Sequence, residues 1–129
     1  MKTKTCILAI LLGVGLTSSR AQDTWTLKAI FGGSRRNGAA GFSVGGKGYI
    51  GTGSDLRDFW EYDPVTNVWR RKADFGGTER ESAVGFSIGS KGYIGTGHAS
   101  LFGGPQVDFW EYDPGTNLWT QKADVGGTP

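Results

Sequence analysis

A twelve-residue phrase occurs twice in this chain and constrains its fold more than any other feature. Residues 58–69 read DFWEYDPVTNVW and residues 108–119 read DFWEYDPGTNLW, so ten of the twelve positions are identical. Upstream, residues 28–53 and 72–97 match at 18 of 26 positions with an offset of 44. A third copy starts at Lys122 with KADVGGTP. Such self-similarity indicates a repeat architecture, with units at 28–71 and 72–121 and a third beginning at 122.

Each unit divides into four strand-like segments separated by turn residues. In the first unit these segments are 38–45, 47–53, 58–63 and 67–75. Gly45-Gly46 favours a two-residue hairpin, because glycine tolerates a positive φ. The Asp63-Pro64 pair favours a second tight turn, because proline fixes φ and aspartate binds nearby backbone N–H groups. We therefore predict an all-β fold of about two four-stranded antiparallel units.

The third segment of each unit carries large aromatic residues on both faces. Side chains alternate along a strand, so Phe59 points to one side and Trp60 and Tyr62 point to the other. A single sheet would leave one of these faces in water. Stacking between similar sheets buries both faces, which explains why the phrase repeats.

The sequence GYIGTG followed by DFWEYDPxTNxW resembles the kelch repeat of kelch and galactose-oxidase-like β-propellers, including secreted bacterial proteins. Gly51-Thr52-Gly53 stands where that family has a glycine doublet, and Tyr62 and Trp69 supply its aromatic pair. The resemblance covers residues 25–129. It implies that each unit is one blade of a propeller, and closed propellers have about 4–8 blades.

Residues 24–31 align with the last strand of each later unit, so they are predicted to be an outer strand without its blade. Two interpretations remain open: an N-terminal part of a longer propeller, or a two-blade chain that closes a ring by oligomerising. We expect residues 22–129 alone to self-associate, because an aromatic sheet face and an edge would be left bare.

The first 21 residues have the pattern of a signal peptide cleaved after Ala21, which predicts a secreted, extracellular or periplasmic protein. Their apolar run is shorter than the roughly 20 residues of a membrane span, so we expect no stable membrane insertion after cleavage. Cleavage removes three cations, leaving 14 − 3 = 11 cations against 12 acidic residues, a net charge of 11 − 12 = −1. This charge argues against nucleic acid as a partner. Cys6 lies in the same segment, so the mature chain has no disulfide.

A binding surface is predicted at one end of the strands. The connections there vary between the units, and the second unit has six extra residues between Gly97 and Asp108. Loops on a rigid scaffold commonly carry function. The candidate ligand-binding residues are Arg36, Asp55, Arg57, Arg80, His98, Leu101, Phe102 and Gln106. Arg36 and Arg80 occupy the same position of the repeat, which favours a framework role over ligand contact for these two.

The preferred function is a non-enzymatic scaffold that binds a protein or a carbohydrate through these loops. The resemblance also implies two alternatives: a sugar mutarotase or oxidase-like enzyme with its active site in other blades, and a structural or adhesive surface module. We expect no catalytic residue, no metal and no cofactor, because copper oxidase chemistry needs several ligands and the mature chain has one histidine. The acidic residues Asp58, Glu61 and Asp63 recur in the second unit, which favours a structural role.

Overall fold

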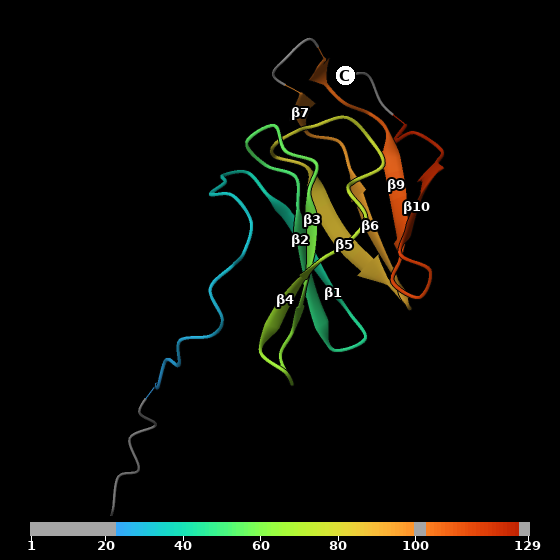
Figure 1. Cartoon of the computed structure of the whole chain (residues 1–129). Helices are drawn as coiled ribbons and strands as arrows, with labels where there is room; N and C mark the ends of the chain where they lie inside the picture. Colours follow the sequence, from blue (N-terminus) through green and yellow to red (C-terminus); the bar gives the residue numbers. More distant parts are fainter. Residues whose placement is uncertain (1–22, 100–102, 127–129) are drawn as a thin grey trace, which may run out of the picture.

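The computed structural model describes residues 23–99 and 103–126, in which all regular structure is β-strand (Figure 1). The first sheet has the order β1 (Ala40–Val44), β2 (Lys47–Gly51), β3 (Phe59–Asp63), β4 (Val68–Arg71). The second sheet repeats this order with β5 (Val84–Ile88), β6 (Lys91–Gly95), β9 (Phe109–Asp113), β10 (Leu118–Lys122). A small hairpin is formed by β7 (His98–Ala99) and β8 (Gly104–Pro105), and neighbouring strands are antiparallel throughout.

The tight turns form where the sequence predicts them. Gly45 and Gly46 have φ values of 59° and 75°, a combination typical of a two-residue hairpin turn. At the other turn, Asp63 Oδ1 accepts the backbone N–H groups of Val65 (2.9 Å) and Thr66 (3.2 Å). These local contacts set the order of the four strands, because each turn forces its two strands to pair as neighbours.

The observed strands lie within the predicted segments but are shorter, and the largest correction concerns 67–75. Strand β4 ends at Arg71, and the chain then leaves the first sheet to pack on the second. The N–H of Ala73 donates to Asn117 Oδ1 (3.0 Å), and the N–H of Phe75 donates to the carbonyl of Arg57 (2.7 Å). The predicted fourth strand is therefore a shorter strand followed by a linker that joins the sheets.

The N-terminal segment 24–31 is not in a strand in the described structure. It extends away from the sheets (Figure 1), and the side chains of Trp25 and Leu27 are 97% and 90% exposed. From Ala29 onwards the segment contacts the first sheet, where the Ala29 N–H donates to Asn67 Oδ1 (2.9 Å). The interpretation of this segment as the outer strand of another blade stays a prediction.

The two sheets approach each other most closely at β1 and β5 and spread apart toward β4 and β10 (Figure 1). The approach is tight because glycines face each other: a Cβ added to Gly85 would lie 2.8 Å from the Gly41 carbonyl oxygen. A larger residue at Gly85 would push the two strands apart. The sheets therefore form a wedge with its narrow edge at the first strand of each.

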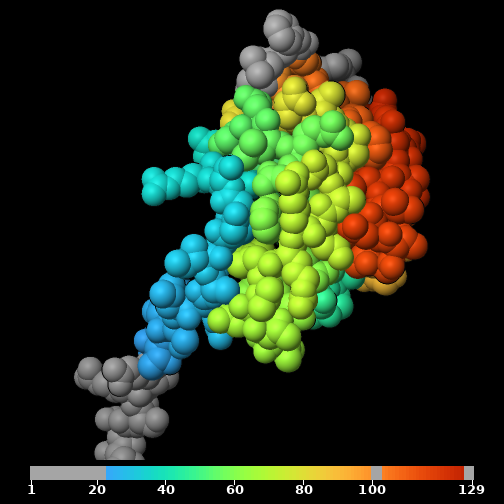
Figure 2. Space-filling model, in the orientation of Figure 1, coloured from blue at the N-terminus to red at the C-terminus, as the bar shows by residue number. Residues whose placement is uncertain are grey.

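The core lies between the sheets, which Figure 2 shows in direct contact. Phe59 of the first sheet is fully buried, with its ring centroid 4.8 Å from that of Tyr112 and 4.9 Å from that of Trp119. Both contacts are edge-to-face, an arrangement that aromatic quadrupoles favour. Tyr49 and Ile94 complete this layer as buried residues. The prediction that similar sheets stack through their aromatic faces is confirmed for this junction.

The predicted signal peptide and its cleavage site after Ala21 lie outside the described residues. In the part of the chain that the structure describes, no helix has the length and apolar character needed to cross a membrane.

Candidate functional site

The candidate residues gather at the end of the sheets opposite the two-residue turns. Antiparallel order brings the β2–β3 connection, the β6–β9 connection and the linker between the sheets to this end, near β7 in Figure 1. Backbone hydrogen bonds join these segments: the Gly53 N–H donates to the Arg80 carbonyl (2.7 Å), and the Ser82 N–H donates to the Gly38 carbonyl (2.8 Å). The loop end, defined as residues 32–38, 52–58, 76–83, 96–99 and 103–108, is therefore one connected surface.

Arg80 lies beneath this surface rather than on it. Its side chain is 0% exposed, and its guanidinium donates to both carboxylate oxygens of Asp108. The other donors reach the Thr96 carbonyl (3.0 Å), the Thr78 carbonyl (3.1 Å) and the Thr78 hydroxyl (3.0 Å). An arginine has five N–H donors, and all five are used here. These contacts support the framework role of Arg80 and leave it no donor for a ligand.

Arg36 repeats this arrangement in the first sheet with three side-chain hydrogen bonds instead of five. Its Nη2 lies 2.6 Å from Asp58 Oδ2, which also accepts the indole N–H of Trp60 (2.7 Å). The second oxygen, Asp58 Oδ1, is buried without a hydrogen-bond partner. Burial opposes ionisation of Asp58, but the bonds from Arg36 and Trp60 outweigh it and lower the pKa of the carboxyl. Asp58 is thus an ionised partner of Arg36, which supports a framework role for this pair as well.

Arg57 and Asp55 hold the β2–β3 connection in shape. Arg57 Nε and Nη2 both donate to the Phe75 carbonyl, at 3.1 and 2.9 Å, while its backbone carbonyl accepts the Phe75 N–H. Ser54 and Asp55 have positive φ values of 47° and 54°, which makes the connection a tight bend. Arg57 is nevertheless exposed to solvent. It therefore anchors the linker between the sheets and also forms part of the surface of the loop end.

The six-residue insertion folds into the β7–β8 hairpin, which was predicted only as a loop. The N–H of His98 donates to the Glu81 carbonyl (2.9 Å), and the N–H of Glu81 donates to the His98 carbonyl (3.0 Å). The side-chain amide of Gln106 donates to the carbonyls of Gly103 (2.9 Å) and Gly104 (3.0 Å), which closes the hairpin from within. Leu101 and Phe102 lie outside the described residues. His98 is exposed on this hairpin and is available to a ligand.

The repeated carboxylates are engaged in ion pairs and hydrogen bonds. Glu61 accepts hydrogen bonds from Lys47 Nζ (2.9 Å) and from the Tyr49 hydroxyl (2.9 Å). Burial opposes its ionisation, but the bonds from Lys47 and Tyr49 lower the pKa of Glu61 overall. A general acid needs a pKa near the working pH, so Glu61 is poorly suited to that role. Among the described residues, no group of three histidine, cysteine, aspartate or glutamate side chains could hold a metal ion.

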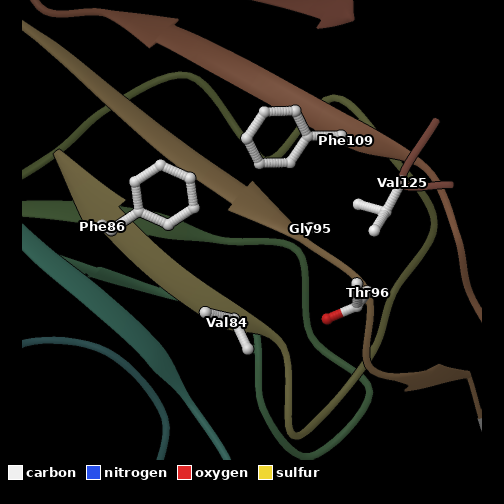
Figure 3. A pocket seen from close by; sticks show the side chains of 6 residues that line it. All are labelled: Val84, Phe86, Gly95, Thr96, Phe109 and Val125. Atoms are coloured by element: carbon white, nitrogen blue, oxygen red, sulfur yellow. The ribbon is translucent and has the colours of Figure 1, made fainter. Parts of the chain in front are cut away.

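An apolar cavity of about 220 Å³ lies on the second sheet and borders the loop end at Thr96 (Figure 3). Its lining consists of Val84, Phe86, Gly95, Thr96, Phe109 and Val125. Sequence reasoning did not single out these residues as a site. The available signal was the position of Val125 in the unfinished third copy, where it aligns with Phe31 and Phe75.

Comparison with known proteins identifies the fold. No family model matches the chain, and no curated protein matches it. It is similar to a solved structure described as "Structure of YjhT", with a TM-score of 0.59, 25% sequence identity and 67% of this chain covered. The chain spans 27% of that structure's length. With the two stacked four-stranded sheets described above, this likeness shows that the protein is all-β and built of β-propeller blades.

Proposed function

We propose that this chain is part of an exported kelch-type propeller that binds a protein or a carbohydrate through the loop end, without catalysing a reaction. The proposal rests on the location of the structural difference between the two sheets. The residues they share, such as the Arg80–Asp108 pair, are occupied by contacts within the fold. The main difference between them is the folded hairpin β7–β8 with exposed His98, at the loop end.

The two strands along the narrow edge of the wedge carry no catalytic group of their own. Strands β1 and β5 read AGFSV and VGFSI, and neither carries an acid, a base or a thiol. In a propeller these inner strands border the central channel, where the enzyme alternative needs polar groups. These two blades thus contribute no titratable side chain from their inner strands.

The proposal can be tested by exchanging one loop between the units. Residues 98–107 are replaced by Ser54–Arg57, which removes the β7–β8 hairpin while using a connection that the same fold already contains. The matched control is Val65→Gly, which copies Gly115 of the second unit into an exposed turn at the opposite end. Wild type and both variants are applied to a printed array of sialylated and neutral glycans and to a panel of immobilised extracellular-matrix proteins.

We expect wild type and Val65→Gly to bind the same probe and the loop-exchange variant to lose it while keeping its urea unfolding midpoint. Binding that survives the loop exchange would contradict the role of the loop end. The mutarotase alternative is measured separately, by NMR of the anomers of free N-acetylneuraminic acid. Faster anomer exchange with wild type than with buffer would replace the binding proposal by an enzymatic one.

A further inference from the structure

The outer face of the second sheet is an unfinished copy of a junction that the first sheet completes. Val84, Phe86 and Ile88 on this face are 58%, 40% and 64% exposed. Their repeat equivalents on the first sheet include Ala40 and Val44, which are 3% and 8% exposed. The same apolar surface is therefore covered on one sheet and open on the other. Figure 3 shows Phe86 and Phe109 bordering the open space together with Val84 and Val125.

On the first sheet, residues of the second sheet cover this apolar surface. Phe42 packs on Gly92 of the second sheet so closely that a Cβ added at Gly92 would overlap the Phe42 ring. Beside it, Phe59 packs against Tyr112 and Trp119. The junction thus consists of a phenylalanine over a glycine, flanked by an aromatic cluster.

The opposite end of the molecule carries the matching half of this junction. Gly48 is the repeat equivalent of Gly92, but a Cβ added there would meet only the Tyr62 Cβ, at 3.9 Å. Tyr62 and Trp69, the equivalents of Tyr112 and Trp119, lie on the same face of the first sheet. The glycine surface at Gly48 is therefore formed and lacks its phenylalanine.

We propose that a second copy of this chain docks head to tail, with Phe86 of one copy over Gly48 of the next. The contact repeats the internal Phe42–Gly92 junction, because Phe86 is the equivalent of Phe42 and the surrounding residues are the same. Such an interface joins two different surfaces and closes into a ring when the rotation permits.

One segment must change its contacts for this docking. At the internal junction the linker residue Phe75 is fully buried. At the open face Val125 holds the equivalent position through its N–H bond to the Val107 carbonyl (2.9 Å), yet its side chain is 44% exposed. An incoming copy carries Phe31 already packed on its own first sheet. Phe31 then takes the position of Val125, and the larger ring fills what the valine leaves open.

The test uses the full chain and two variants, one at each end of the molecule. Gly48→Glu blocks the glycine surface and should fold, because its Cβ has room and its φ lies outside the left-handed region. Phe86→Glu removes the docking phenylalanine, and Ile88→Glu serves the same purpose if Phe86→Glu fails to fold. Arg35→Glu, at an exposed position of the loop end where the second unit already has Glu79, is the control. Sedimentation velocity over a series of concentrations gives the mass of each, and far-UV circular dichroism checks folding.

We expect wild type and Arg35→Glu to associate, and each end variant to weaken association by about tenfold or more, the loss expected for one buried phenylalanine. Mixing Gly48→Glu with Phe86→Glu should restore a 1:1 dimer, because each variant keeps the surface that the other lacks. A wild type that is monomeric at every concentration would overturn the proposal and leave the open face to a further blade. A face-to-face dimer would also overturn it: Gly48→Glu would still dimerise alone, and the mixture would rescue nothing.

Discussion

Replacing Arg80 by methionine tests whether the loop end is held by its buried ion pair. Methionine keeps the apolar stem of the side chain but removes all five donors. Asp108 then retains only the indole N–H of Trp110, at 2.7 Å from its Oδ2. The carbonyls of Thr78 and Thr96 lose their bonds as well. The substitution therefore leaves the Asp108 carboxylate without its counter-ion, and two carbonyls without their donors, in a place that water reaches poorly.

The size of the effect follows from the burial of the two partners. Breaking a buried ion pair by removing one partner costs about 3–5 kcal/mol. The Asp108 side chain is 20% exposed, so water compensates part of the loss and places the cost near the lower end, about 3 kcal/mol. Arg36→Met should cost less, about 2 kcal/mol, because Arg36 bonds only one oxygen of Asp58.

Urea unfolding followed by tryptophan fluorescence measures these costs. The variants are made in the Gly48→Glu background and compared at one protein concentration, because self-association would add to the apparent stability. Arg35→Met is the control, since Arg35 is the exposed neighbour of Arg36. The reasoning is refuted if Arg80→Met lies within about 0.5 kcal/mol of wild type, the range of ordinary surface substitutions. It also fails if Arg36→Met costs more than Arg80→Met.

Three further predictions concern pH, glycine and the turn asparagine. Burial opposes ionisation of Asp108, but the bonds from Arg80 and Trp110 lower the pKa of its carboxyl. The contribution of Asp108 to stability is therefore present above about pH 4 and is lost as pH falls through the lowered pKa. Urea unfolding midpoints measured from pH 7 to 2 should fall less steeply in Arg80→Met than in the parent. Gly92→Ala should destabilise by about 1–3 kcal/mol by clashing with the sheet opposite, whereas Gly48→Ala, measured in the Phe86→Glu background, should be neutral or stabilising. Asn117→Gly keeps the positive φ of 58° but loses two hydrogen bonds, so it should cost about 1–3 kcal/mol, and Asn117→Ala should cost more.

Local chemistry made the strand order predictable from the sequence. Gly45-Gly46 and Asp63-Pro64 specify tight turns, and the observed pairs across them follow directly. The stacking of sheets was also predictable, because strand β3 carries Phe59 and Trp60 on opposite faces. The β7–β8 hairpin was not predictable in this way. Its sequence shows no alternation, and its position depends on Glu81, a residue from another connection.

The candidate site was predicted less well, because loop location alone does not tell exposed side chains from buried ones. Arg80 reaches back into the fold to Asp108, which lies 28 residues away in sequence. A signal was nevertheless present: the pairs Arg36–Asp58 and Arg80–Asp108 recur at the same positions of the repeat. His98 has no such counterpart, and it stays exposed on the hairpin. A polar pair that recurs in both units therefore indicates a structural role. The location of a residue in a loop is weaker evidence that it binds a ligand.

In the terminal sheets of a repeat, identical residues have different surroundings. Gly48 and Gly92 occupy the same position in KGYIG, yet only Gly92 is covered by a phenylalanine. In a stack of similar sheets, each sheet has one face that matches the sheet before it and one that matches the sheet after it. The two terminal faces are then complementary to each other, because each is a copy of one half of the internal junction. Exposed apolar residues such as Phe86 are thus the consequence of the repeat itself, and the partner that best fits them carries the same repeat.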